Sequence, residues 1–207
     1  MQYNIAARTR PGVDVLVAGG GPAGFGAALA AAREGLSVLL VEAGGALGGT
    51  STLGALPFWL GATTGSIPFR HMLEQNLQYR DLPHPRRAVG GVFAEAMDRI
   101  RREGGGVGPC VLAQTDRYPA LDRLGCHDEY TFDLECGKRV LETMVLEAGV
   151  EILYYTLALD VARSGDAVQG VYLSNKDGVT YVPVRAVVDA TGDADLVARA
   201  GFETYKG

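Results

Sequence analysis

The sequence predicts an α/β fold with a central parallel sheet, a helix layer on one face and a β-meander on the other. Three observations support this prediction. The segment 13–41 has the pattern of a β-α-β unit, with a glycine cluster between its first strand and its helix. The segment 150–184 has apolar runs separated by turn residues, which is typical of a meander. A last apolar run at 186–189 ends in a turn of small residues.

The β-α-β unit is predicted from the order of its apolar and small residues. Val13–Ala18 is a mostly apolar run that predicts a strand, and the alanine-rich stretch Phe25–Arg33 predicts a helix. Ser37–Val41 predicts the next strand, and the acidic residue Glu42 follows it directly. A strand, a glycine turn, a helix, a strand and an acid in this order are typical of a dinucleotide-binding unit.

The glycine cluster has the pattern G-x-G-x-x-G, and each of its three glycines has a steric role. Gly19 permits the tight turn after the strand, Gly21 lets a pyrophosphate approach the backbone, and Gly24 lets the helix lie close to the sheet. Glu42 lies 23 positions after Gly19, close to the spacing expected of an acid that binds a ribose. The alternative is a glycine turn in another kind of α/β protein, and the flanking strands, helix and acid argue against it.

A second glycine-rich loop follows the acid. It runs from Ala43 to Thr52 and combines glycines with small hydroxyl side chains, which suits close packing against a ligand. It does not match a P-loop, because it lacks Gly-Lys-Ser/Thr, and it does not match the G-x-S-x-G turn of a nucleophilic serine. From its letters alone, a ligand-contacting loop and a flexible surface loop are equal alternatives.

The segment from Leu56 to about Tyr130 is the least regular part of the sequence. It contains one predicted helix at 69–79 and a second at 88–103, which a run of three glycines ends. The second helix carries the basic run Arg99–Arg102, which we expect to form a solvated helix face. Residues 107–123 are predicted to be irregular.

Regular structure is predicted again after this segment. Residues 135–148 predict a helix, with Asp133 as its N-cap and Gly149 at its end. The strands of the meander are predicted by the apolar runs 150–159, 167–174 and 179–184. After the run at 186–189 and its turn, a short helix at 194–200 is predicted.

Composition excludes several classes of protein. The 207 residues are 47% hydrophobic and 21% charged, which is enough to form the packed core of one domain or one and a half. The formal net charge of −5 argues against general nucleic-acid binding, which depends on a basic surface. Membrane binding is not expected, because no apolar run has membrane-spanning length, and residues 1–12 lack the apolar segment of a secretory signal.

Cysteine and histidine positions do not predict a metal site. The three cysteines share no C-x-x-C spacing, and they are Cys110, Cys126 and Cys136. An odd count suggests a reducing compartment, so we expect a cytoplasmic protein. A zinc site built on Cys126–Glu129 would need a second closely spaced pair of ligands, and the sequence has none. The histidines are scattered through the irregular segment, at His71, His84 and His127. No catalytic residue is predicted.

Three motifs of the chain are specific when they are taken together. They are Val17–Gly24, Leu47–Thr50 and Asp189–Leu196. With them the chain resembles the FAD-dependent oxidoreductase family, within the glutathione-reductase-like flavoproteins and near the fumarate reductase flavoproteins. The resemblance covers most of Val13–Gly201 and is weakest from Leu56 to Tyr130. It implies a Rossmann-like ββα three-layer fold in which 1–12 is a leader and 13–207 an FAD-binding domain, with a less regular excursion at about 56–130.

The resemblance implies FAD as the cofactor and a role for each matched position. The glycine turn would line the pyrophosphate, Glu42 would hold the adenosine ribose, and the backbone of Ala158 would meet the adenine. The segment Gly48–Thr50 would lie along the phosphates and the flavin side, and Thr191–Asp193 would close the pyrophosphate and ribityl region. The implied cofactor-binding residues are Gly19, Gly21, Pro22, Ala23, Gly24, Glu42, Gly48, Gly49, Thr50, Ala158, Ala190, Thr191, Gly192 and Asp193.

The function implied by the resemblance is an FAD-binding oxidoreductase module that passes a hydride or electrons through the flavin. Family members continue beyond the last motif with a substrate domain and a final glycine-rich segment. We therefore expect an incomplete domain, a fragment or a subunit, with little turnover of its own. A partner chain or self-association would complete the flavin site. Two alternatives are an NAD-utilising enzyme similar to thiazole synthase and a non-catalytic dinucleotide-binding subunit of a redox complex.

Overall fold

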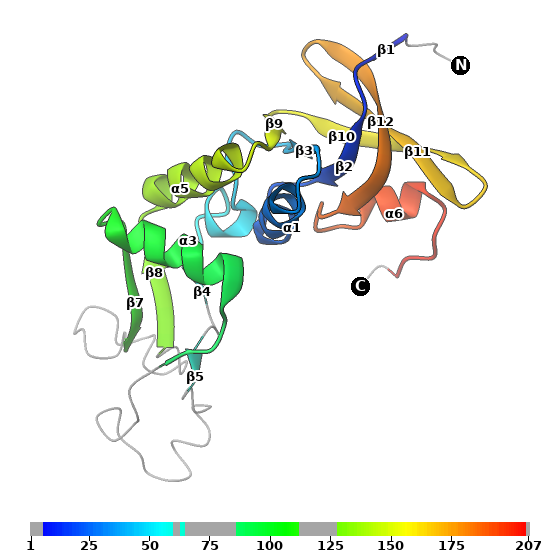
Figure 1. Ribbon diagram of the computed structural model, residues 1–207. Coiled ribbons are helices and arrows are strands. Elements are labelled where there is room, and N and C mark those ends of the chain that lie inside the picture. The colour runs from blue at the N-terminus through cyan, green and yellow to red at the C-terminus, as the bar shows by residue number, and fades with distance from the viewer. Residues whose placement is uncertain (1–5, 60–62, 65–85, 112–127, 206–207) are drawn as a thin grey trace. The chain divides into compact units, whose positions relative to one another are not determined.

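The computed structural model describes residues 6–59, 63–64, 86–111 and 128–205 (Figure 1). The chain divides into two compact units. Met1–Ala55 and Leu141–Gly207 form the first, here called the sheet unit, and Leu56–Val140 forms the second, here called the inserted unit. The helix predicted at 69–79, residues Cys126 and His127, and the other two histidines lie outside the described residues.

The sheet unit is built around a seven-stranded sheet. The strand order is β10-β11-β12-β2-β3-β9, and β1 also pairs with β12. The strands are β1 (Ala7–Thr9), β2 (Val13–Ala18), β3 (Val38–Val41), β9 (Glu151–Leu153), β10 (Leu157–Ser164), β11 (Ala167–Asn175) and β12 (Gly178–Asp189). Strands β12, β2, β3 and β9 run parallel, whereas β10, β11 and β12 pair antiparallel as a meander. The predicted parallel sheet and the predicted meander are therefore confirmed.

One long strand joins the meander to the parallel sheet. The first half of β12, Gly178–Pro183, pairs with β11, and its second half, Val184–Asp189, pairs with β2. The sequence analysis divided this strand into two runs, at 179–184 and 186–189, and that division is wrong. Strand β12 stays continuous because it gains a new neighbour, β2, just where its pairing with β11 ends (Figure 1).

The sheet unit has three layers. Leu16 and Leu39 on one face of the parallel sheet share a buried core with Val171 and Leu173 of the meander. Alternate residues of the same strands face the other way, where helix α1 (Pro22–Arg33) packs against β2 and β3. The side chains that α1 buries are Phe25, Ala28 and Leu29. The helix layer and the meander thus cover opposite faces of the parallel sheet, as predicted.

The strand predicted at 150–159 is broken in the structure. Strand β9 ends at Leu153 and β10 begins at Leu157, with Tyr155 between them in the left-handed region at φ +51°. The N–H of Tyr155 donates to the carbonyl of Gly44 at 3.1 Å, and the N–H of Thr156 donates to the carbonyl of Glu42 at 2.9 Å. The chain leaves its pairing with β3 and binds the loop that follows the acid, so the prediction of one strand was wrong.

The segment 1–12 was predicted as an N-terminal leader. Within it, Ala7–Thr9 forms strand β1, which pairs in parallel with Val179–Tyr181 of β12. All three residues of β1 are exposed, so the strand has no hydrophobic periodicity by which the sequence could have revealed it.

The inserted unit combines short strands with helix α3 (Gly91–Arg102). Its described strands pair in the order β4-β8-β7 and as the pair β5-β6. They are β4 (Phe58–Trp59), β5 (Thr63–Thr64), β6 (Arg86–Arg87), β7 (Gly106–Val111) and β8 (Asp128–Phe132). The helix predicted at 88–103 is confirmed. Strand β7 shows that the prediction of irregular structure was wrong for residues 107–111.

Helix α5 (Leu134–Glu147) begins in the inserted unit and ends in the sheet unit. Its start is fixed by the predicted N-cap, because the N–H of Cys136 donates to Oδ1 of Asp133 at 2.8 Å. Gly149 follows its end at φ +83°, a conformation that glycine adopts without steric cost. The helix and both of its predicted terminal residues are confirmed.

Candidate dinucleotide site

The three glycines of the turn between β2 and α1 have different surroundings. A Cβ atom on Gly19, which has φ +100°, would overlap the carbonyl of Ala190. A Cβ atom on Gly24 would overlap the carbonyl of Gly19. A Cβ atom on Gly21 would meet no atom within 4 Å. Gly19 and Gly24 are therefore required by packing inside the protein, whereas the space over Gly21 is open to a ligand.

The first turn of α1 leaves donors facing the same space. Gly21 is the N-cap residue, and no side chain caps the helix. The first N–H groups of any α-helix have no partner within the helix, and the positive end of the helix dipole lies beside them. Pro22 at the first position has no N–H to lose, so Ala23 and Gly24 provide these groups. This end of α1 suits an anion such as a pyrophosphate.

Glu42 at the end of β3 binds two backbone N–H groups. Its Oε2 accepts a hydrogen bond from Gly20 at 2.7 Å, and its Oε1 accepts one from Gly44 at 2.6 Å. One acid therefore connects the glycine turn to the second glycine-rich loop. A carboxylate has about four lone-pair positions, so two of them remain for hydroxyl groups of a ribose. The sequence predicts a role for Glu42 in ribose binding but does not indicate its two backbone partners.

The second glycine-rich loop packs on the first. The N–H of Gly48 donates to the carbonyl of Gly20 at 2.8 Å, and Gly48 itself has φ +102°. A Cβ atom on Gly49 would lie 3.0 Å from the Cα atom of Gly21. A short 3₁₀ helix, Gly49–Ser51, follows and leaves Thr50 exposed. These contacts favour a loop fixed beside the turn over the flexible surface loop that the letters alone allowed.

The turn after β12 closes the other side of the site. The N–H of Ala190 donates to the carbonyl of Ala18 at 2.8 Å, which holds the turn against the end of β2. Gly192 has φ +91°, and a Cβ atom there would meet no atom within 4 Å. Asp193 is exposed. The short helix α6 (Asp195–Arg199) follows, one residue later than predicted.

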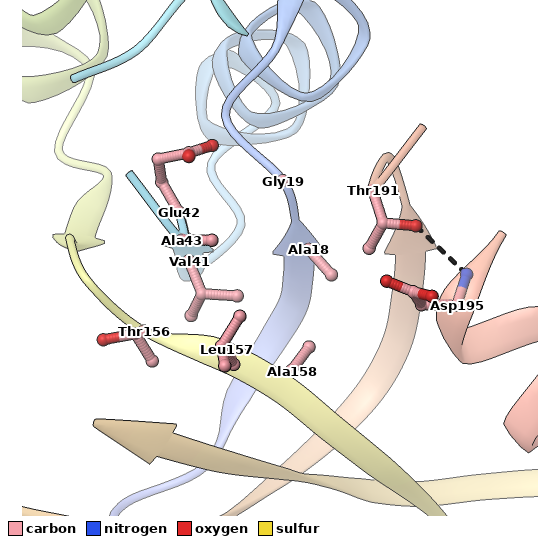
Figure 2. Close-up of a pocket in the computed structure, with 10 residues that line it drawn as sticks. All are labelled: Ala18, Gly19, Val41, Glu42, Ala43, Thr156, Leu157, Ala158, Thr191 and Asp195. Atoms are coloured by element: carbon pink, nitrogen blue, oxygen red, sulfur yellow. Dashed lines mark hydrogen bonds between the residues drawn. The ribbon is translucent and has the colours of Figure 1, made fainter. Parts of the chain in front are cut away.

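These elements enclose a pocket at the carboxyl edge of the parallel sheet. Figure 2 shows Glu42 and Thr191 on opposite sides of the end of β2, with residues Thr156, Leu157 and Ala158 crossing beside them. The pocket has a volume of about 140 Å³. Its lining residues are Ala18, Gly19, Val41, Glu42, Ala43, Thr156, Leu157, Ala158, Thr191 and Asp195. Sites for whole small molecules usually exceed about 300 Å³, so this pocket suits one end of an extended ligand.

The structure thus brings the predicted residues together from separate parts of the chain. The glycine turn, Glu42, the loop at 48–50, Ala158 and the turn at 190–193 all lie at one edge of one sheet. Six of the lining residues were not predicted to bind the cofactor, namely Ala18, Val41, Ala43, Thr156, Leu157 and Asp195. Leu157 could have been found as an apolar neighbour of Ala158, but nothing in the letters marks Asp195 as a lining residue.

The structure also bears on the basic helix face, on metal binding and on membrane spans. In the inserted unit, Arg99 pairs with Glu95 at 3.0 Å, and Arg101 lies 3.9 Å from Asp98, as expected of a solvated helix face. No three metal-ligating side chains come together in the described ranges. Likewise, no helix in the part of the chain that the structure describes is long and apolar enough to cross a membrane.

A glycine turn at a helix start, an acid on the next strand and a pocket at the carboxyl edge of the sheet define a dinucleotide-binding α/β protein. The model of the family described as FAD dependent oxidoreductase matches residues 14–207. The chain belongs to this family, and it is an FAD-binding oxidoreductase module. The match favours FAD over the NAD-utilising alternative.

Similar proteins include curated relatives and solved structures. A soluble pyridine nucleotide transhydrogenase from Marinomonas sp. (strain MWYL1) is 34% identical over 112 residues, which cover 51% of the chain and 21% of the transhydrogenase. A geranylgeranyl bacteriochlorophyll reductase-like protein from Thermoplasma acidophilum has a TM-score of 0.55 at 19% identity, over 96% of the chain and 43% of that protein. THI4 from Thermovibrio ammonificans has a TM-score of 0.52 at 17% identity, over 92% of the chain and 64% of that protein.

The two structural likenesses concern the fold alone. The curated relatives are much longer than their matched parts, because the matches span 21% to 28% of their length. The relatives therefore carry most of their residues outside the matched region.

Proposed function

We propose that this chain holds the adenosine and pyrophosphate parts of FAD at the carboxyl edge of its sheet, as the cofactor-binding part of a larger flavoenzyme. The observation that carries the proposal is the open space over Gly21, which lies at the uncapped start of α1. At the other two glycines of the pattern, atoms of the protein occupy the space where a side chain would lie. When bound, FAD supplies a flavin that accepts and donates a hydride or single electrons.

Each predicted contact has a structural basis in the sheet unit. The pyrophosphate would lie over Gly21 and accept hydrogen bonds from the free N–H groups of α1. The remaining lone pairs of Glu42 would accept the ribose hydroxyl groups. The adenine would enter the small pocket beside Ala158, where Val41 and Leu157 offer apolar contacts. The loops at 48–50 and 190–193 would border the phosphates and the ribityl chain.

Substitution of Gly21 tests the proposal. Gly21 has φ −65° and ψ −176°, which valine also adopts, so Gly21→Val should fold normally and fill only the open space. We expect its FAD affinity to fall at least about 100-fold, because an isopropyl group would occupy the place of the pyrophosphate. Flavin fluorescence titration measures the affinity, and thermal melting without FAD measures the fold.

The matched control is Gly26→Ala, one turn along the same helix. A Cβ atom on Gly26 also meets nothing within 4 Å, and alanine favours the helix by up to about 1 kcal/mol. We expect this variant to bind FAD as the wild type does and to melt no lower. Equal FAD affinity in the wild type and in Gly21→Val would refute the placement of the pyrophosphate.

We further propose that the chain needs other residues to complete the flavin site, from a longer protein, from a partner chain or from a second copy. The small share of its relatives that it matches supports this, and the odd cysteine count is in keeping with a reducing, cytoplasmic location. Transhydrogenase relatives make NADH and NADPH the first reductants to test. We expect the FAD-loaded chain to show little flavin bleaching with either in anaerobic absorbance measurements. Rapid and complete bleaching would contradict this expectation.

A further inference from the structure

We propose that Asp189 is a positioning residue of the nucleotide site, which holds the turn Ala190–Ala194 in the shape that the ligand meets. Asp189 lies in the motif Asp189–Leu196, but the resemblance implies no role for it. The inference rests on the proposed function, because it concerns the wall of the same pocket. It goes beyond the proposed function, because it assigns the shape of this wall to a carboxylate that does not itself line the pocket.

Asp189 is the last residue of β12, and its carboxylate accepts four hydrogen bonds. Oδ1 accepts from the N–H of Thr191 at 3.1 Å and from its hydroxyl at 2.7 Å. Oδ2 accepts from the N–H groups of Leu196 and Val197, both at 2.9 Å. These last two donors belong to the first turn of α6, where N–H groups have no partner within the helix. One carboxylate therefore joins the strand, the turn and the helix.

The hydroxyl of Thr191 passes this restraint on to the pocket. It donates to Asp189 and accepts the N–H of Asp195 at 3.1 Å, as the dashed line in Figure 2 shows. Thr191 and Asp195 both line the pocket, opposite Glu42. A shift of the turn would move both lining residues together.

The same turn also governs the approach to Gly19. The carbonyl of Ala190 lies where a Cβ atom of Gly19 would be, and the N–H of Ala190 is held by Ala18. The turn thus fits closely against the start of the glycine cluster. A shift of the turn would therefore change the space above the end of β2 as well as the wall of the pocket.

The turn has a conformation that needs an external restraint. Gly192 and Ala194 both have positive φ, at +91° and +57°, and Ala194 is not a glycine. Glycine adopts positive φ without steric cost, whereas the conformation of Ala194 persists only where surrounding contacts determine it. Partial burial disfavours the charged carboxylate of Asp189, but the hydrogen bonds from Thr191, Val197 and Leu196 outweigh this effect and lower its pKa. The restraint is therefore a charged group at neutral pH, which makes its hydrogen bonds stronger.

Substitution of Asp189 by asparagine tests the inference. Asp189→Asn keeps the shape of the side chain but replaces one acceptor oxygen by an amide that faces donors. We expect the FAD affinity of the full chain to fall about tenfold or more, since the turn would lose a charged acceptor, to which hydrogen bonds are stronger. The matched control is Asp166→Asn, which removes the same charge from an exposed hairpin turn of the meander. It should bind FAD as the wild type does.

A second measurement reads the turn without any ligand. In the FAD-free chain, amide hydrogen exchange at Leu196 and Val197 should be slow in the wild type and in Asp166→Asn, and at least about tenfold faster in Asp189→Asn, since the carboxylate of Asp189 accepts hydrogen bonds from both amides. Unchanged exchange at both amides would overturn the inference. So would faster exchange with unchanged FAD affinity, because Asp189 would then be structural only. A wild-type chain that binds no FAD would overturn the proposed function, while exchange would still decide whether Asp189 fixes the turn.

Discussion

The carboxylate of Glu42 accepts hydrogen bonds from the backbone N–H groups of Gly20 and Gly44. Gly20 is held on both sides, because its carbonyl also accepts the N–H of Gly48. A side chain at Gly20 would force a shift of its neighbours, since its Cβ atom would lie 2.6 Å from Cδ2 of Leu47 and 3.0 Å from Oε2 of Glu42. The acid therefore shapes the two glycine-rich loops in addition to the role in ribose binding that the sequence implies.

Replacing Glu42 separates these two roles. Glu42→Gln loses one acceptor and places an amide N–H₂ group against a backbone donor. We expect the FAD-free protein to lose about 1–3 kcal/mol of stability, the usual range for a buried or charged hydrogen-bonding partner. Urea unfolding of the FAD-free chain measures this loss, and Glu34→Gln, at an exposed position after α1, is the matched control. If Glu42→Gln unfolds at the urea concentration of the wild type, the acid serves the ligand alone.

The G-x-G-x-x-G pattern gave the right turn but could not distinguish its glycines. The sequence pattern predicts a steric role for all three glycines. In the structure, protein atoms lie close to Gly19 and Gly24, whereas the space beside Gly21 is open. The carbonyl of Ala190, which excludes a side chain at Gly19, comes from the other end of the chain. The local sequence pattern does not indicate a contact of this kind.

At the level of elements, the sequence predicted what local periodicity determines. The strand at 13–18, helix α1 and the strand before Glu42 form a contiguous pattern, and the structure contains each of them. Helix α5 was predicted with its N-cap and its terminal glycine, because these signals lie within a few residues of the helix. The meander was predicted from its turn residues.

The break between β9 and β10 has no such signal. The residues Leu153–Leu157 have high strand propensity, so their composition predicts continuation. The break arises because Tyr155 and Thr156 donate their N–H groups to the loop after Glu42, more than 100 residues earlier in the chain. The α6 partners of Asp189 are local, because they follow it by only seven and eight residues, but the end of a strand does not indicate them. The break between β9 and β10 was decided by tertiary hydrogen bonds.

At the scale of the whole molecule, the two edges of the parallel sheet have different tasks. The carboxyl edge carries glycine loops, positive φ angles and the pocket. The amino edge carries a network in which Asp14 binds Ser37 and Arg185, so that it connects β2 to the start of β3 and to β12. Ser37 donates its N–H at 2.9 Å and its hydroxyl at 2.7 Å, and Arg185 donates at 2.8 Å. This edge holds the sheet together away from the ligand.

The network around Asp14 predicts how the stability of the protein depends on pH. Hydrogen bonds from the hydroxyl and the N–H of Ser37, followed by the one from Arg185, lower the pKa of Asp14 to about 2. An unfolded aspartate has a pKa of about 3.9, so the contribution of Asp14 is complete above this value and is lost as the pH falls towards 2. We expect Asp14→Asn to melt below the wild type at pH 7, and the difference between the two melting temperatures to shrink between pH 5 and pH 2.

The control for this experiment is Asp177→Asn, in the exposed turn between β11 and β12. Its melting temperature should follow that of the wild type at every pH. FAD affinity at pH 7 should be the same in Asp14→Asn as in the wild type, because the network lies at the edge of the sheet away from the glycine turn. A constant difference in melting temperature from pH 7 to pH 2 would show that Asp14 stabilises the sheet without its charge. A loss of FAD affinity would show that the two edges of the sheet are coupled.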